Sequence, residues 1–138
     1  MLKNYERDLQ QLRRNQKNLR KHMETQQLFD NVRQWGIDKG ITGINGSGTR
    51  PKQLEKVLEE IEETRSAVAR FDWASLVGAR ECLDCLDEIE DGIGDSIVTL
   101  IILAEMHGLK AEKCLESAYR VISKRTGQMI DGVFVKDQ

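Results

Sequence analysis

The stretch LEEIEET, residues 58–64, places four glutamates in little more than one helical turn. They are Glu59, Glu60, Glu62 and Glu63. Apolar residues such as Leu58 and Ile61 recur at helical spacing beside them, which predicts an amphipathic helix. Because like charges three or four residues apart destabilise an isolated helix, either these carboxylates all face water or something positive lies between some of them.

The composition around this stretch favours a single helical domain. The chain has 138 residues, 39% of them hydrophobic and 32% charged, with one proline and few aromatic residues. This size suits one core, and the long stretches rich in Leu, Glu, Lys and Arg are typical of helices. We therefore predict an all-α helical bundle, with strand-like alternation only near the C-terminus.

Charge and hydropathy exclude several classes of protein. A formal net charge of −2 argues against a general nucleic-acid binder. The start of the chain is polar, and its best apolar run, at residues 97–104, is too short to span a bilayer. Three cysteines, an odd number, fit a reducing compartment. These features predict a cytoplasmic protein that binds neither nucleic acid nor membrane.

The N-terminal half divides into two predicted helices and a loop before the glutamate stretch. Residues 1–27 have a narrow apolar stripe and are predicted to form an amphipathic helical extension. A second helix should carry Phe29 and Trp35 and end between residues 36 and 40. The glycine-rich loop at residues 40–53 lacks the Lys and Ser/Thr of a Walker phosphate loop. Pro51 then suits the first turn of the glutamate helix, which we expect to run to about Arg70.

The C-terminal half is predicted to contain two more helical segments and a hairpin. Residues 71–80 resemble a turn leading into a helix whose apolar part runs from Asp95 to His107, with a glycine cap following. A further helix should span residues 110–125. The last segment, residues 128–138, alternates around an Asp-Gly pair, which predicts a short β-hairpin.

Two acidic rows are the strongest chemical signal in the sequence. On a helix, Glu59 or Glu60 can direct its carboxylate toward the same spot as Glu63, whereas Glu62 points elsewhere. The later row contains Glu88, Asp91 and Asp95 at i, i+3 and i+7. If the rows face each other, a hard divalent cation, Mg2+ or alternatively Mn2+, would neutralise the repulsion and leave coordination positions for phosphate oxygens.

These motifs resemble a known enzyme family. LEKVLEEIEET, residues 54–64, followed by DEIEDGIGDSIVTLIILAEMHGL, residues 87–109, is similar to the MazG-like branch of the all-α nucleoside triphosphate pyrophosphohydrolases. The pattern of that family is EExxE, a spacer, then ExxD leading into an apolar helix. The resemblance covers about residues 28–127 and implies a pyrophosphohydrolase domain there. Lys56, Glu59, Glu60 and Glu63 match the first motif, and Asp95 matches the aspartate of the second.

The second motif departs from the family at one position. With Asp95 as its aspartate, the family's glutamate falls on Gly92, which has no ligand atom. Asp91 or Glu88, one and two turns before Asp95, are the candidates to replace it.

The resemblance implies a reaction and a set of site residues. The reaction is hydrolysis of a nucleoside or deoxynucleoside triphosphate between the α- and β-phosphates, with Glu59 as a candidate base. Family members are dimers or tetramers with sites near subunit interfaces, so we expect a homodimer or homotetramer. The tail from Gly127 to Lys136 is similar to that of phage members, which suggests a role in nucleotide pools, for example removal of dGTP.

Several residues outside the acidic rows are candidates to bind the substrate. The metal ligands implied by the resemblance are Glu60, Glu63, Asp95, Asp91 and Glu88. Candidates to bind phosphates are Lys56, Lys52, Arg50 and Arg125. Candidates to contact the base are Trp35, by stacking, and Asn45, by hydrogen bonds.

Other functions remain open at this stage. The chain could be a helical oligomerisation or regulatory module whose acids are merely solvated, or a nucleotide-binding relative that has lost catalysis at Gly92. Cys82 and Cys85 form a C-x-x-C pair, but too few further ligands are available for structural zinc, so buried thiols are the better interpretation.

Overall fold

The computed structural model describes residues 7, 8, 10–12, 14, 24–78 and 82–138. Its contacts divide the chain into two units, Met1–Asp30 and Asn31–Gln138, and each is described by itself. In the first unit, the described residues between positions 7 and 14 are helical and exposed. Most of the helix predicted over residues 1–27 lies outside the described residues.

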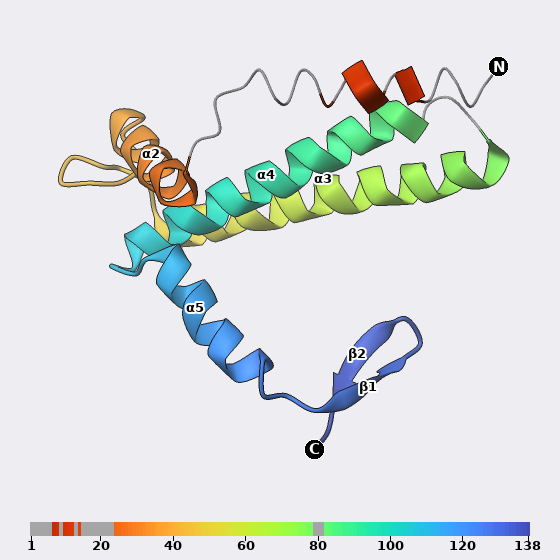
Figure 1. The fold of residues 1–138 in the computed structure, drawn as a ribbon. Helices are drawn as coiled ribbons and strands as arrows, with labels where there is room; N and C mark the ends of the chain where they lie inside the picture. Colours follow the sequence, from red (N-terminus) through yellow and green to blue (C-terminus); the bar gives the residue numbers. More distant parts are fainter. Residues whose placement is uncertain (1–6, 9, 13, 15–23, 79–81) are drawn as a thin grey trace. The chain divides into compact units, whose positions relative to one another are not determined.

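The rest of the chain is mostly helical and ends in a two-stranded antiparallel sheet, as predicted (Figure 1). Its elements are α2 (Thr25–Asp38), α3 (Arg50–Val77), α4 (Cys82–Met106), α5 (Ala111–Ile122), β1 (Gly127–Ile130) and β2 (Val133–Lys136). The two long helices, α3 and α4, lie side by side in opposite directions and form the framework of the second unit (Figure 1).

Helix α3 is longer than the sequence suggested. It begins with Pro51 in its first turn and ends at Gly78, whose φ of 68° is the left-handed conformation of a helix C-cap. The predicted end at Arg70 and the predicted turn over residues 71–80 are wrong. No glycine or proline interrupts residues 71–77, so the helix continues until Gly78 ends it.

The other elements follow the prediction more closely. Helix α4 ends at Met106, and Gly108 has a φ of 68°, as expected for the residue that caps it. Helix α5 ends at Ile122, earlier than predicted, so Arg120 rather than Lys124 or Arg125 is in its last turn. The hairpin turns at Asp131 and Gly132, whose φ values of 48° and 82° are both positive, as a type I′ turn requires.

A small core holds the second unit together. It consists of Val57, Ala67 and Ala74 from α3 with Cys85, Ile101 and Ile102 from α4. The end of α2 packs on α4 through Gly36, where an added Cβ would lie 2.5 Å from Cδ1 of Ile102. In the same region, Arg33 is 8% exposed, and its Nε lies 2.9 Å from a carboxylate oxygen of Glu105 while its Nη2 pairs with Glu112.

The C-terminal elements contribute little to this core. Helix α5 contains no buried residue, and every residue of β1 and β2 is exposed. Within the described ranges, no single helix has both the length and the apolar character needed to cross a bilayer.

Candidate functional site: an acidic cleft between two antiparallel helices

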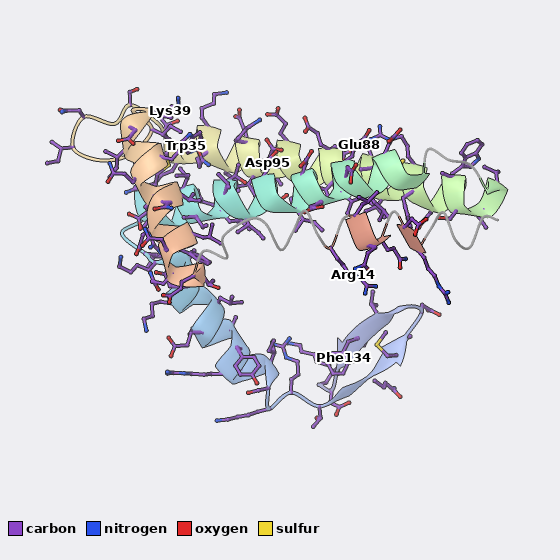
Figure 2. All side chains as sticks on the ribbon, turned by 45° about the horizontal axis from the view of Figure 1, so that its top comes forward. Arg14, Trp35, Lys39, Glu88, Asp95 and Phe134 are labelled. Atoms are coloured by element: carbon purple, nitrogen blue, oxygen red, sulfur yellow. The ribbon has the colours of Figure 1, made fainter. Side chains whose placement is uncertain are left out.

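The antiparallel pairing of α3 and α4 brings two acidic residues of α3, Glu62 and Glu63, beside the acidic row of α4. Glu63, Glu88, Asp91 and Asp95 all line one cleft of about 430 Å³. Glu88 and Asp95 are labelled along α4 in Figure 2. The remaining residues of the lining are Glu62, Ser66, Ala67, Arg70 and Gly92. Of the predicted α3 row, Glu63 therefore faces the same space as the α4 row, whereas Glu59 and Glu60 do not line it.

Arg70 lies among these carboxylates and pairs with Glu88 across the two helices. It is the basic residue of the cleft lining, and it compensates part of the negative charge there. Sequence reasoning did not single it out. The available signal was its position seven residues after Glu63, which places both side chains on the same side of α3.

Glu62 also lines the cleft, although the sequence predicted that its side chain points away from that of Glu63. Its carboxylate accepts a hydrogen bond of 2.9 Å from Nε of Arg65. The hydrogen bond from Arg65 lowers the pKa of the Glu62 carboxyl.

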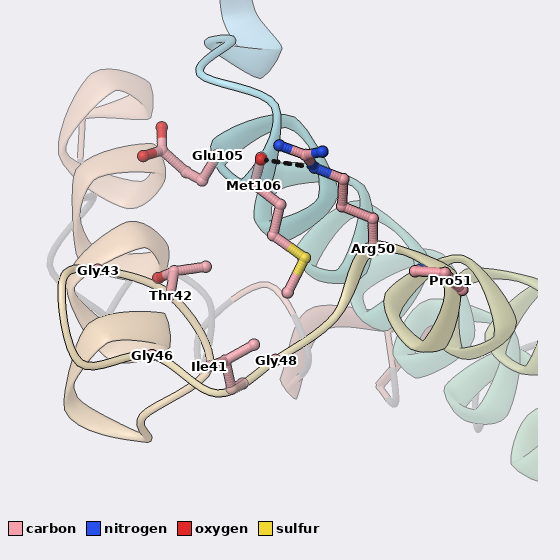
Figure 3. Close-up of a pocket in the computed structure, with 9 residues that line it drawn as sticks. All are labelled: Ile41, Thr42, Gly43, Gly46, Gly48, Arg50, Pro51, Glu105 and Met106. Atoms are coloured by element: carbon pink, nitrogen blue, oxygen red, sulfur yellow. Dashed lines mark hydrogen bonds between the residues drawn. The ribbon is translucent and has the colours of Figure 1, made fainter.

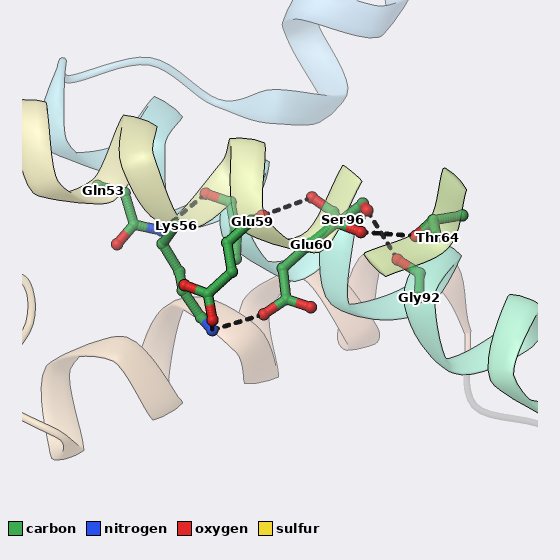
Figure 4. Close-up of polar contacts among 8 residues, drawn as sticks. Gln53, Lys56, Glu59, Glu60, Thr64, Gly92 and Ser96 are labelled. Carbon is green, nitrogen blue, oxygen red and sulfur yellow. Dashed lines mark hydrogen bonds and ion pairs between the residues drawn. The ribbon is translucent and has the colours of Figure 1, made fainter. Parts of the chain in front are cut away.

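Glu60 has a different environment from Glu63. It is 6% exposed and is not part of the cleft lining. Its carboxylate lies 2.8 Å from Nζ of Lys56, which also donates a 3.0 Å hydrogen bond to Glu59 (Figure 4). The hydrogen bond to Glu60, and to a smaller extent the one to Glu59, raises the pKa of Lys56 above its usual value. The positive group that lies between Glu59 and Glu60 is therefore the ammonium group of Lys56.

Gly92 is the point of closest approach between the two long helices. A Cβ added to Gly92 would lie 2.4 Å from Oγ1 of Thr64, so no side chain fits there without movement of α3 or α4. The hydroxyls nearby bond within their own helices: Thr64 donates to the carbonyl of Glu60, and Ser96 donates to the carbonyl of Gly92, both at 2.7 Å (Figure 4). The position that the resemblance assigns to a glutamate is thus a packing contact.

The carboxylates that line the cleft are ligands of the kind that a hard cation binds, but they do not lie close enough together to form a metal site. Carboxylate oxygens are the ligands that Mg2+ prefers. Among the described residues, however, no three side chains of His, Cys, Asp or Glu come together closely enough to hold a metal ion. The structure therefore provides an acidic cleft with the right chemistry and no preformed metal centre.

A second pocket, of about 520 Å³, lies where the glycine-rich loop meets the end of α4 (Figure 3). Arg50 lines it and donates a 3.1 Å hydrogen bond from Nε to the carbonyl of Met106. Arg50 precedes Glu63 by thirteen residues, which corresponds to about 20 Å along α3. This pocket is therefore separate from the acidic cleft within one chain.

The other predicted substrate residues are not gathered at the cleft. Lys52 pairs with Glu55 at 2.7 Å, and Arg125 is exposed beyond the end of α5. Asn45 is exposed on the loop, and Trp35 is 45% exposed on α2. Of the predicted phosphate ligands, Lys56 is the one that lies next to predicted catalytic residues, Glu59 and Glu60.

The described thiols differ in their surroundings. Cys85 is buried, as predicted, whereas Cys114 is exposed, and both are free. His107 lies at the end of α4, where its Nδ1 is 2.7 Å from the carbonyl oxygen of Leu103.

Comparison with known proteins gives one phage relative. No protein-family model matches the chain, and no solved structure matches it. An uncharacterized 18.2 kDa protein from the rep-hol intergenic region of Haemophilus phage HP1 (strain HP1c1) is 32% identical over 84 residues, which is 61% of this chain and 42% of the relative. The chain thus spans less than half of the relative's length.

Proposed function

We propose that the chain is a divalent-metal-dependent nucleoside triphosphate pyrophosphohydrolase. It would cleave a nucleoside or deoxynucleoside triphosphate, dGTP being one candidate, between the α- and β-phosphates to give the monophosphate and pyrophosphate. The observation that carries the proposal is the cleft between α3 and α4, in which Glu63, Glu88, Asp91 and Asp95 share one space. The phage origin of the relative fits an enzyme that acts on nucleotides in the host cytoplasm.

The residues of the cleft would hold the metal. Glu63, Asp91 and Asp95 would supply the carboxylate oxygens, and Glu88 would become available if it left Arg70. Bound Mg2+ or Mn2+ would supply charge compensation for the phosphates and lower the pKa of a water molecule. The cleft lies open on the chain's surface, so a triphosphate can reach its carboxylates.

Basic residues next to the acids would hold the phosphates. Lys56 is half-exposed and lies within 3.0 Å of both Glu59 and Glu60, so its ammonium group can turn from them toward a phosphate oxygen. Glu59, which is exposed and would be freed from Lys56 in that arrangement, would be the base that accepts a proton from water. Glu60, which is buried, would keep Lys56 in position.

The test is a pyrophosphate-release assay over the ribo- and deoxyribonucleoside triphosphates, with and without Mg2+. The variants are Glu63→Gln and Asp95→Asn, and the matched control is Glu55→Gln on α3, because Glu55 is exposed, pairs with Lys52 and does not line the cleft. We expect both cleft variants to lose activity by about 10²-fold or more, and the control to keep it. A parent protein that releases no pyrophosphate from any triphosphate would refute the enzyme, and activity that survives both cleft substitutions would refute the site.

A helical assembly or regulatory module is the second candidate, and one observation favours it. Helix α5 and the hairpin bury none of their residues, although α5 is strongly amphipathic. An inactive nucleotide-binding relative is the intermediate case. A module without a metal site predicts no release of pyrophosphate and no stabilisation by Mg2+, whereas the inactive relative predicts nucleotide binding alone.

A further inference from the structure

Arg70 and Glu88 mark one end of the acidic cleft between α3 and α4. Their ion pair joins the two helices and shows which of their residues lie opposite each other. Since the helices are antiparallel, seven residues back along α3 correspond to seven residues forward along α4, which brings Glu63 opposite Asp95. The two ends are thus about 10 Å apart along the helices. One end has an arginine beside a carboxylate, and the other has two carboxylates.

Small residues line the cleft between its two ends. They are Ser66 and Ala67 of α3 and Gly92 of α4. None of them has a side chain long enough to separate Arg70 from the acidic end. Because the side chain of arginine is long and has many rotamers, the guanidinium group of Arg70 can move along the cleft without a change of the backbone.

The Arg70–Glu88 pair is easily exchanged for another partner. The side chains of Arg70 and Glu88 are 57% and 50% exposed. Exposed ion pairs contribute little to stability, because water solvates the separated charges well. A guanidinium group forms two parallel hydrogen bonds with a phosphate as it does with a carboxylate, and a terminal phosphate carries more negative charge. A phosphorylated ligand in the cleft would therefore compete with Glu88 for Arg70.

The sides of the two helices opposite the cleft are apolar. Ile61 precedes Glu63 by two residues, and Ile93 precedes Asp95 by two residues. Two residues correspond to about 200° around a helix, so each isoleucine points nearly opposite to its neighbouring acid. Both isoleucines are half-exposed. A charged ligand that approaches the middle of the α3–α4 pair therefore finds charged partners on the side of the cleft, where Arg70 lies.

Lys56 and Arg70 stand on either side of Glu63 along α3. Each is seven residues from Glu63, so the three side chains lie on one side of the helix. The glycine-rich loop, which carries the candidate base contact Asn45, adjoins the start of α3 at Arg50. The base of a bound nucleotide would therefore lie toward Lys56. The phosphates farthest from the base would lie toward Arg70.

We propose that Arg70 binds the β- and γ-phosphates of the triphosphate and that Glu88 holds it until this ligand arrives. The inference rests on the proposed function, because it assigns a role to Arg70 in the same cleft. In the free chain, the guanidinium group is the cation that partly neutralises the carboxylates. When Arg70 turns to the phosphates, Glu88 is left as a further carboxylate for a divalent cation, beside Asp91. The cleft thereby selects ligands that carry phosphates beyond the first.

Two variants that break the same ion pair separate this role from a structural one. Arg70→Gln removes the cation, whereas Glu88→Gln removes its partner and keeps Arg70. If the pair only joined the two helices, both variants would change ligand binding in the same way. Arg120→Gln is the matched control, because Arg120 is exposed, pairs with Glu116 on α5 and does not line the cleft.

Calorimetric titration with Mn2+ alone is the first measurement. Arg70→Gln should bind Mn2+ about threefold or more tightly than the parent, because a competing positive charge has left the cleft. Glu88→Gln should bind Mn2+ about threefold or more weakly, because a carboxylate is lost. The control should match the parent. A parent that binds no Mn2+, or equal affinities of the parent and Arg70→Gln, would overturn the inference.

Titration with inorganic pyrophosphate at saturating Mg2+ is the second measurement. Arg70→Gln should bind pyrophosphate about tenfold or more weakly than the parent, because a bidentate pair with phosphate is lost. Arg70→Lys keeps the charge without the planar fork and should fall between the two. Glu88→Gln should stay within about threefold of the parent, because it loses an exposed ion pair and retains Arg70. The monophosphate dGMP, which has only the α-phosphate, should bind the parent and Arg70→Gln equally.

Several results of this titration would overturn the inference. They are a parent that binds no pyrophosphate, an unchanged affinity in Arg70→Gln, and an equal loss of affinity in Arg70→Gln and Glu88→Gln. Both variants should fold, since an exposed ion pair contributes little to stability. Should Arg70→Gln fail to fold, Arg70→Lys takes its place, and an affinity equal to that of the parent would then contradict the role of Arg70.

The proposed reaction is tested separately from this role. A parent that binds pyrophosphate through Arg70 but releases none from any triphosphate would refute the reaction and leave the role of Arg70 intact. A parent that hydrolyses a triphosphate with the same KM as Arg70→Gln would refute the role of Arg70 and leave the reaction intact.

Discussion

Gly92 and Thr64 set the distance between α3 and α4 at the middle of the acidic cleft. An added Cβ at position 92 would be 2.4 Å from Oγ1 and 3.2 Å from Cβ of Thr64. The hydroxyl of Thr64 is itself held by the carbonyl of Glu60 at 2.7 Å, so it cannot simply turn away without losing that bond. A glutamate at position 92, where the resemblance would place one, would therefore collide with Thr64.

Replacing Gly92 by alanine is expected to destabilise the parent by about 1–2 kcal/mol, because overpacking outweighs the better helix propensity of alanine. In a Thr64→Ala background the same change should be neutral or stabilising, since Oγ1 is gone. Urea unfolding of the two single variants and the double variant measures this coupling. Strictly additive effects would show that the two residues do not compete for the same space.

Lys56 is the residue-scale link between the buried Glu60 and the surface. The Lys56 side chain is half-exposed, whereas the Glu60 side chain is 9% exposed. Removal of the lysine leaves a carboxylate in a poorly solvated position without its cation.

Lys56→Met is expected to lower the free energy of unfolding by about 1–2 kcal/mol at pH 7, with solvent exposure of the lysine keeping the loss small. Lys52→Met, whose partner Glu55 is exposed, is the control and should cost about 0–1 kcal/mol. The pKa of Lys56 is raised above 10.5 in the folded chain, so its contribution is complete below pH 10.5 and is lost as the pH rises further. Equal stability losses in the two variants would contradict this role.

At the scale of elements, the local sequence predicted several ends of helices and the hairpin turn correctly from residues that favour helix starts, helix ends or turns. Pro51 and Gly108 mark a helix start and a helix end that the structure confirms, and Asp131-Gly132 marks the hairpin. The error at residues 71–80 arose because an aromatic and polar stretch was interpreted as a turn although it contains no residue that stops a helix before Gly78. The end of α5 was predicted at residue 125 but lies at Ile122, because no glycine directly follows Ile122 to mark the end of the helix.

The hairpin offers a test at this scale. Gly132 has a φ of 82°, a conformation that costs a residue with a Cβ about 1–2 kcal/mol. Gly132→Ala should therefore weaken the pairing of β1 with β2, whereas Asp131→Asn should keep it, because asparagine favours the same turn. Amide hydrogen exchange of Val133 and Ile130, which face each other in the register, reports the difference. Unchanged exchange rates in Gly132→Ala would mean that contacts beyond the turn hold the strands together.

At the scale of the whole molecule, part of the site could be predicted and part could not. Helical spacing predicted that Glu63 and Asp95 belong to acidic rows that could face each other, and the packing of α3 on α4 puts both residues in one cleft. Periodicity could not separate Glu60 from Glu63, since burial of Glu60 depends on how the helices pack. Arg70 was missed for a related reason: its ion pair with Glu88 spans two helices.

Metal binding should stabilise the whole chain if the cleft gathers its carboxylates around a cation. We expect Mg2+ or Mn2+ to raise the Tm, since a ligand present at a hundredfold excess over its Kd adds about 2.7 kcal/mol to the free energy of unfolding. Asp95→Asn should abolish the increase, and NaCl at equal ionic strength should not reproduce it. An identical increase in the parent and in Asp95→Asn would show that the effect is general screening rather than binding in the cleft.

The near-opposite directions of Ile61 and Glu63, and of Ile93 and Asp95, have a consequence for divergence among related chains. Substitutions in the acidic cleft leave the exposed isoleucines on the opposite side of each helix in place, so a lineage can change one of these two surfaces while it keeps the other. Two neighbouring positions on one helix can thus evolve at different rates under different selection.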